Sequence, residues 1–340
     1  MKRIALVPVA ALLMGAREPA APAKRGLSPG EIVATAPAAD WAAIASSDLM
    51  VMDLAPLGGK PRRVVIQLMP APFSQGWVSN IRKLVAARWY DGVSVNRVQD
   101  NYVVQWGDAS EKKPLPDGLA VVEENHYALD LLGSEILKNT LDRKGEETRY
   151  TLFTQDVPGS PKVSFALAFG NAPQGWFKLG WPISVGVRAI SGNNRESFPG
   201  PVDVAWPVHC YGMVGVGRGM PPDTGTGAEL YTVIGHAPRH LDRNIALVGR
   251  VIEGIEHLSS LPRGPGAMGF YEHAEDRVPI LSVRMGNEVE GLPRYHYLST
   301  DSTSFAAYAD ARANRRDPFF IRPAGGADIC NIPVPVRRVP

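Results

Sequence analysis

The sequence predicts a mainly β protein whose short strands close on themselves. Three observations favour this architecture: short apolar runs recur between turn residues, only two short helical patterns lie among them, and Gly and Pro are abundant, at 34 and 30 of 340 residues. Hydrophobic content of 45% and charged content of 21% are ordinary for a globular protein. The length allows a sizeable core in one large domain or two.

The first predicted element is a β-hairpin at residues 49–68. Apolar runs at 49–54 and 64–68 flank the turn sequence GGKP at 58–61. Prolines 70 and 72 end the second strand, and a helical period follows. The apolar residues of that helix, which fall on one face, are Phe73, Trp77, Ile81, Leu84 and Val85.

A second hairpin is predicted in the stretch WYDGVSVNRVQDNYVVQWGD, residues 89–108. Strands at 93–98 and 102–105 flank the turn residues 99–101. Arg97 lies in the first strand and, judged from these residues alone, is most simply a solvated charge. The alternative is that a fixed cation beside an apolar patch binds a neutral substrate and polarises one of its atoms.

The remaining chain is divided by composition and pattern. Strands are predicted at 212–217, 230–234, 246–252 and 279–285, with a short helix at 254–261. We therefore expect a main domain at 48–286, interrupted by an insertion at about 109–205 that carries a helical run near 127–141. An arm at 24–47 with a helical signal at 40–45 precedes the domain, and a tail at 287–340 with a helical piece at 303–313 follows it.

The N-terminus has the pattern of an export signal at residues 1–23. Lys2 and Arg3 precede a short apolar run, 4–13, which is too short to span a bilayer. The sequence APA at 21–23 fits a cleavage site, with Ala16 as an alternative. No later run predicts a membrane span, so we expect an exported, periplasmic protein.

Charge and motifs argue against several functions. The net charge of +2, from 36 basic and 34 acidic residues without a clustered basic face, argues against a nucleic-acid partner. The run GVGRG at 215–219 lacks the spacing of a nucleotide loop. His236 and His240 are separated by Pro238, which argues against a helical metal site. We expect no metal and no cofactor.

Two cysteines, Cys210 and Cys330, are present. An even count in an oxidising compartment permits a disulfide. Two buried free thiols are an equally good interpretation, and the sequence leaves both open.

Six short motifs occur in order along residues 48–108 and 212–286. They are the opening hairpin, WYDG (89–92), VNRV (95–98), QWGD (105–108), ELYTVIG with HLD (229–235 and 240–242), and VGRVIEG (248–254). They resemble segments of the cyclophilins, a family of peptidyl-prolyl cis-trans isomerases, whose corresponding runs include Tyr-Tyr-Asp-Gly, Phe-His-Arg-Val and Gln-Gly-Gly-Asp. Each motif alone is weak, and their number and order carry the resemblance.

The resemblance implies a cyclophilin-like eight-stranded antiparallel barrel with two capping helices and a peptide site on an outer face. Arg97 would be the catalytic arginine, and Gln105 would hydrogen-bond the substrate backbone. The implied substrate-binding residues are Tyr102, Val103, Gly217, Arg218, Glu229, Tyr231, His240, Leu241 and Ile245. No cofactor is implied, and the partners would be proline-containing, unfolded or partly folded proteins.

Several of these positions depart from the family's usual residues. Glu229 stands where the family usually has Gln, and could pair with Arg97 or Arg218. Ile245 stands where many members have His. Tyr102 and Tyr231 replace phenylalanines, and Val103 is smaller than the usual Met.

The residues suit isomerisation of an X–Pro bond, which requires no nucleophile or metal. Amide resonance imposes a barrier of roughly 18–20 kcal/mol, and a guanidinium stabilises the twisted state best. We therefore expect an exported prolyl isomerase. The departures favour, as the runner-up, a cyclophilin-like peptide-binding or chaperone module with little turnover. A weaker alternative is an envelope assembly scaffold that uses the insertion and the tail.

Overall fold

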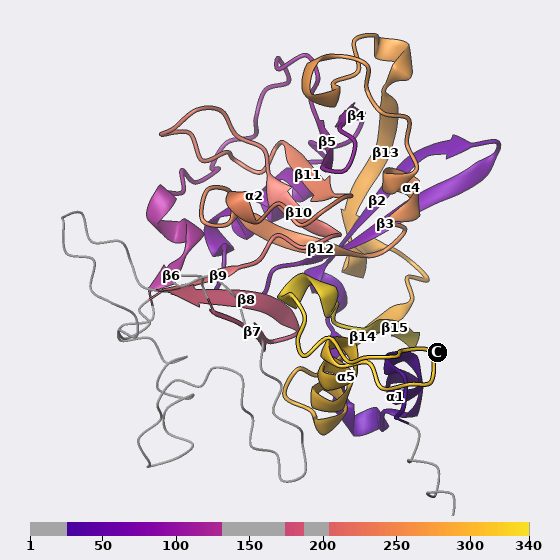
Figure 1. Ribbon diagram of the computed structural model, residues 1–340. Helices are drawn as coiled ribbons and strands as arrows, with labels where there is room; N and C mark the ends of the chain where they lie inside the picture. The colour runs from indigo at the N-terminus through magenta and orange to yellow at the C-terminus, as the bar shows by residue number, and fades with distance from the viewer. Residues whose placement is uncertain (1–25, 131–173, 187–203, 340) are drawn as a thin grey trace, which may run out of the picture.

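A closed antiparallel barrel of eight strands forms the centre of the protein (Figure 1). The structure, a computed structural model, describes residues 26–130, 174–186 and 204–339. The strands follow one another around the barrel in the order β10-β11-β5-β4-β13-β2-β3-β12, which confirms the predicted fold class. Their bounds are β2 Leu49–Leu57, β3 Lys60–Leu68, β4 Ser94–Val98, β5 Val103–Gly107, β10 Met213–Val216, β11 Leu230–Val233, β12 Leu247–Glu253 and β13 Val278–Met285.

Both predicted hairpins are present. β2 pairs with β3 around the Gly58-Gly59 turn, and β4 pairs with β5 around residues 99–102. Val95, Val104 and Trp106 are fully buried in the barrel core. Side chains alternate along β5, so Gln105, between Val104 and Trp106, lies on the outer face of the barrel. In β4 the register shifts between Val95 and Arg97, and this irregularity lets Arg97 share the outer face although Val95 is in the core.

Two helices pack against the barrel, as predicted. α2 (Gln75–Ala86) places Trp77, Ile81, Leu84 and Val85 in the main core, where none of them is exposed. The Trp77 indole N–H donates to the carbonyl oxygen of Thr224 at 3.2 Å, so this buried polar group is paired. α4 (Glu256–Ser259) is a single turn that buries Leu258.

The insertion contributes a four-stranded sheet in the order β6-β9-β8-β7, beside the barrel (Figure 1). Its strands are β6 Leu129–Asp130, β7 Gln174–Lys178, β8 Trp181–Gly186 and β9 Val204–Pro207. Trp181 is buried in the main core, and the Arg250 guanidinium of β12 lies 4.6 Å from its ring centroid. The helical run predicted near 127–141 is wrong over residues 127–130, which end a 3₁₀ turn and form β6; the rest lies outside the described residues.

The arm and the tail form one small unit, at the lower right of Figure 1. A three-stranded sheet joins β1 (Trp41–Ile44), β14 (Arg294–Leu298) and β15 (Val336–Val339). The helices α1 (Pro29–Thr35) and α5 (Thr303–Ala313) pack together beside it. The helical signal at 40–45 is wrong, because residues 41–44 pair with β14 as a strand.

A disulfide joins Cys210, before β10, to Cys330 in the tail, with an S–S distance of 2.04 Å. The disulfide links the tail to the segment just before β10, a barrel strand at the edge of the candidate site. Among the described residues, no helix is both long and apolar enough to cross a membrane. The predicted export signal lies outside the described residues.

Candidate functional site

Four neighbouring strands bring the predicted site residues into one row on the outer face of the barrel. The register pairs Arg97 of β4 with Gln105 of β5, Gln105 with Tyr231 of β11, and Tyr231 with Gly215 of β10. Directly opposed residues in antiparallel strands share a face. The row therefore places a guanidinium, an amide and an aromatic ring side by side, although Arg97 and Tyr231 are 134 residues apart in sequence.

Arg97 is half-buried and held by three hydrogen bonds. Its Nε donates to the Met268 carbonyl oxygen at 2.8 Å, one Nη donates to Gln105 Oε1 at 2.9 Å, and the other donates to Gln99. The pKa of Arg97 is lowered by burial, and the charges of Tyr102 and Glu229 oppose that effect. A guanidinium has five N–H donors, so two remain uncommitted among the described contacts.

A loop without a recognisable sequence motif completes the surroundings of Arg97. This loop, residues 262–277, follows α4, and Phe270 forms an isolated β-bridge with Arg97 and places its ring centroid 5.4 Å from the guanidinium carbon. Gly269 has φ +83°, and a Cβ there would lie 2.6 Å from the Val98 carbonyl oxygen, so only glycine fits this approach. The only sequence signal was the run of Gly and Pro at 262–269.

Gln105 lies between Arg97 and Glu229. Its Oε1 accepts from Arg97, and its Nε2 donates to Glu229 Oε1 at 2.6 Å. Glu229 packs against Gly217, where an added Cβ would lie 2.8 Å from the glutamate Cγ. Glu229 could have paired with Arg97 or Arg218, but among the described residues its carboxylate accepts from Gln105 and forms no ion pair with either arginine.

An apolar patch lies next to the guanidinium. The patch consists of buried Val103, Tyr231 and Val233, against which half-buried Tyr102, Leu241 and Ile245 pack. The Tyr102 ring centroid is 5.7 Å from the Arg97 guanidinium carbon, and exposed His240 stacks on Tyr102 at 6.0 Å. The structure thus brings the predicted aromatic, aliphatic and histidine residues together around one surface.

The two remaining predicted residues, Gly217 and Arg218, follow β10 at the edge of the row. Arg218 donates to the carbonyl oxygens of Asn244 at 3.0 Å and of Gly219 at 2.8 Å. These two hydrogen bonds hold the Arg218 guanidinium beside Asn244, the residue that precedes Ile245. Within residues 26–130, 174–186 and 204–339, no group of three His, Cys, Asp or Glu side chains could hold a metal ion.

The arrangement provides a fixed cation with free donors, a polar amide and an apolar surface within one row. Such a site can seat an apolar ring and hydrogen-bond an adjacent amide, which is the chemistry of peptide binding and amide rotation.

Comparison with known proteins shows the protein family to which the chain belongs. The sequence profile of the cyclophilin type peptidyl-prolyl cis-trans isomerases matches residues 62–285, more than half of the chain. The chain therefore belongs to this family. No curated protein sequence matches it.

One solved structure shows the same fold. The chain is similar to the cyclophilin AquaCyp293 from Hirschia baltica, with a TM-score of 0.59 and 19% identity over 88% of this chain and 93% of that one. It also matches a cyclophilin type peptidyl-prolyl cis-trans isomerase from Cryptosporidium parvum, at a TM-score of 0.35 and 8% identity over 69% of this chain and 98% of that one.

Proposed function

We propose that the protein accelerates rotation about X–Pro peptide bonds, with Arg97 as the catalytic residue. The observation that carries this proposal is the pair of uncommitted N–H donors on Arg97, held rigidly beside the apolar patch. The patch receives the prolyl ring, and Gln105 holds the substrate backbone. Arg97 then donates toward the prolyl nitrogen or the adjacent carbonyl oxygen as the amide twists.

The physical basis is preferential stabilisation of the twisted amide. Twisting removes resonance and leaves a lone pair on the prolyl nitrogen, which accepts a hydrogen bond that the planar amide does not. The guanidinium is already positioned by three hydrogen bonds, so little reorganisation is required at the moment of rotation.

We further propose that the protein is exported and acts on unfolded or partly folded proteins in the periplasm. The charged and apolar N-terminal pattern and the Cys210–Cys330 disulfide support an oxidising compartment. Cell fractionation of a strain that makes the full chain tests the location. Recovery of the protein in the cytosolic fraction with Met1 retained would contradict it.

Relaxation of a short Ala-Pro peptide from cis to trans tests the activity. The wild type is expected to accelerate relaxation, and Arg97→Ala to lower kcat/KM about 100-fold. Arg63→Ala is the matched control, because Arg63 is an exposed β3 arginine paired with Asp53 at 2.8 Å. Equal rates for the wild type and Arg97→Ala would contradict the proposal.

A second candidate function is peptide binding with little turnover. The Glu229 carboxylate, joined to Gln105 at 2.6 Å, favours it, because a negative charge near Arg97 weakens the positive potential. Saturable binding of a proline peptide by the wild type, without acceleration of its isomerisation, would establish this second function and exclude the first.

A further inference from the structure

The hydroxyl of Tyr231 is directed into the protein, away from the patch surface. The side chain is 4% exposed, and its Oη lies 2.9 Å from Nε2 of His209. The ring lies across Gly215, where an added Cβ would be 2.3 Å from both Cζ and Oη. The absence of a side chain at Gly215 therefore leaves space for the Tyr231 ring, and His209 hydrogen-bonds the Tyr231 hydroxyl.

His209 is itself held by Asp242. The imidazole is 1% exposed, and Oδ1 of Asp242 accepts from its Nδ1 at 2.9 Å and from its backbone N–H at 3.0 Å. Burial alone would raise the pKa of Asp242, but the hydrogen bond from His209 and the positive charge of Arg239 lower it. The ionised carboxylate can only accept, so Nδ1 carries a hydrogen, and in the neutral imidazole Nε2 accepts from Tyr231.

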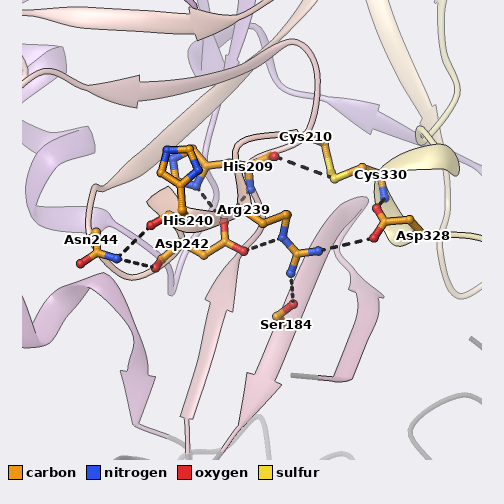
Figure 2. A network of polar contacts seen from close by, with 9 residues as sticks. All are labelled: Ser184, His209, Cys210, Arg239, His240, Asp242, Asn244, Asp328 and Cys330. Atoms are coloured by element: carbon orange, nitrogen blue, oxygen red, sulfur yellow. Dashed lines mark hydrogen bonds and ion pairs between the residues drawn. A yellow bond between two sulfur atoms is a disulfide. The ribbon is translucent and has the colours of Figure 1, made fainter. Parts of the chain in front are cut away.

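Asp242 is anchored in turn by parts of the chain that lie outside the barrel (Figure 2). Arg239 donates to Asp242 Oδ2 at 2.7 Å and to Ser184 Oγ of β8 at 3.1 Å, and lies 3.8 Å from Asp328 of the tail. Cys210, the residue after His209, is bonded to Cys330 two residues after Asp328. The inserted sheet and the tail thus converge on Arg239, which holds the carboxylate that pairs with the imidazole.

We propose that His209 is a positioning residue that acts through the Tyr231 hydroxyl to fix the base of the apolar patch for the prolyl ring. The inference rests on the proposed function. A phenylalanine at position 231 would have no hydroxyl to hold, so the device depends on the tyrosine. The prolyl ring contacts the patch before and during rotation, so loss of positioning raises KM and leaves kcat nearly unchanged.

A double-mutant cycle tests the inference. His209→Asn keeps a polar atom near the Nδ1 position, toward Asp242, but cannot reach Tyr231. His209→Gln reaches toward Tyr231 and serves as the conservative variant. Each is made in the wild type and in a Tyr231→Phe background, and kcat and KM are measured on the Ala-Pro peptide.

His209→Asn is expected to raise KM about fivefold with kcat within about twofold, and His209→Gln to restore KM to within about twofold of the wild type. In the Tyr231→Phe background, His209→Asn is expected to change KM by less than about twofold. An equal rise of KM in both backgrounds, or a fall of kcat alone, would overturn the inference.

Two further readouts keep the inference testable on its own. Nitrogen NMR of the His209 ring in the wild type requires no variant, and a ring protonated at Nε2 alone would overturn the assigned hydrogen bond. If the wild type binds the peptide without accelerating isomerisation, the proposed function fails. The same cycle, measured on the peptide Kd, then decides the role of His209.

Discussion

At the scale of single residues, the orientation of the Gln105 amide is set from both sides. Arg97 donates to its oxygen at 2.9 Å, and Glu229 accepts from its nitrogen at 2.6 Å. A glutamine amide can otherwise flip between two nearly equivalent positions. The carboxylate therefore orients the amide that we propose contacts the substrate backbone, while its charge reduces the positive potential at the guanidinium.

Glu229→Gln is expected to raise kcat/KM about two- to threefold at low salt, because the charge is lost while an acceptor for Gln105 remains. The gain is expected to shrink at high ionic strength. Glu229→Ala is the matched control and is expected to lower kcat/KM, because the amide loses its second partner. Peptide kinetics at two salt concentrations measure both effects, and a tenfold loss in Glu229→Gln would contradict the account.

Asp108, at the end of the QWGD motif, is expected to make a contribution to the free energy of unfolding that is lost in acid. Burial would raise its pKa, but N–H groups of Lys113, Ser110 and Lys112 and the Ser110 hydroxyl donate to the carboxylate and lower the pKa to about 2, from 3.8. A depressed pKa stabilises the fold above pH 3.8, and this contribution is lost as the pH falls toward 2.

Asp108→Asn is therefore expected to lower the free energy of unfolding by about 1 kcal/mol at pH 7, a value reduced for solvent screening. Urea unfolding of the two proteins at several pH values measures the difference. The difference is expected to close between pH 3.8 and 2. A difference that stays constant down to pH 2 would contradict the assignment.

Arg97 and Gln105 were accessible from sequence because they belong to one hairpin with motifs of fixed spacing. The contacts that complete the site were not. The Met268 carbonyl that holds Arg97 lies 171 residues away and is a backbone group without a sequence signature. His209 has no motif of its own, and its partners Tyr231 and Asp242 lie 22 and 33 residues further along the chain, so only the placed strands show the contacts.

At the scale of elements, the period of the apolar residues predicted the barrel strands, α2 and α5 well. The two helical predictions that were wrong, at 40–45 and at 127–130, both concern segments that become strands through pairing with distant parts of the chain. The alanine-rich segment 40–45 has helical propensity, but residues 41–44 form β1 because β14 offers a paired edge. The short strand β6 likewise exists through pairing with β9, which lies 74 residues further along the chain.

The Cys210–Cys330 bond closes a loop across a sequence separation of 120 residues. Reduction is expected to lower the free energy of unfolding by about 4–5 kcal/mol in the chain-entropy estimate. Denaturant unfolding with and without a reductant measures the loss, and a Cys210→Ser/Cys330→Ser variant is expected to match the reduced protein. A loss below about 1 kcal/mol would show that the bond adds little constraint to the unfolded chain.

At the scale of the whole molecule, the terminal unit shares a core with the barrel. Ile44 of β1 and Tyr295 of β14 pack with Leu49 and Val65 of the barrel strands. Tyr295 also donates from its hydroxyl to Glu253 of β12 at 3.0 Å. The arm and the tail appeared as separate extensions in the sequence, because no local pattern records that they pair with each other.

Tyr295→Ala is therefore expected to destabilise the entire protein by about 3–5 kcal/mol, since it opens a cavity between the two units. Unfolding is expected to remain one transition when followed by tryptophan fluorescence and by circular dichroism. Tyr295→Phe, which loses only the hydroxyl, is the control and is expected to cost about 1 kcal/mol. Two separate transitions would show that the terminal unit unfolds independently of the barrel.

We propose that the row on β4, β5 and β11 rotates X–Pro bonds through Arg97. Exchange NMR on an Ala-Pro peptide at equilibrium measures the cis–trans rate with and without added protein, at matched concentrations of folded wild type and Arg97→Ala. We predict fast exchange with the wild type, and exchange about 100-fold slower per molecule with Arg97→Ala. Exchange that the wild type does not accelerate, or that both proteins accelerate equally, would exclude Arg97 as the catalytic residue.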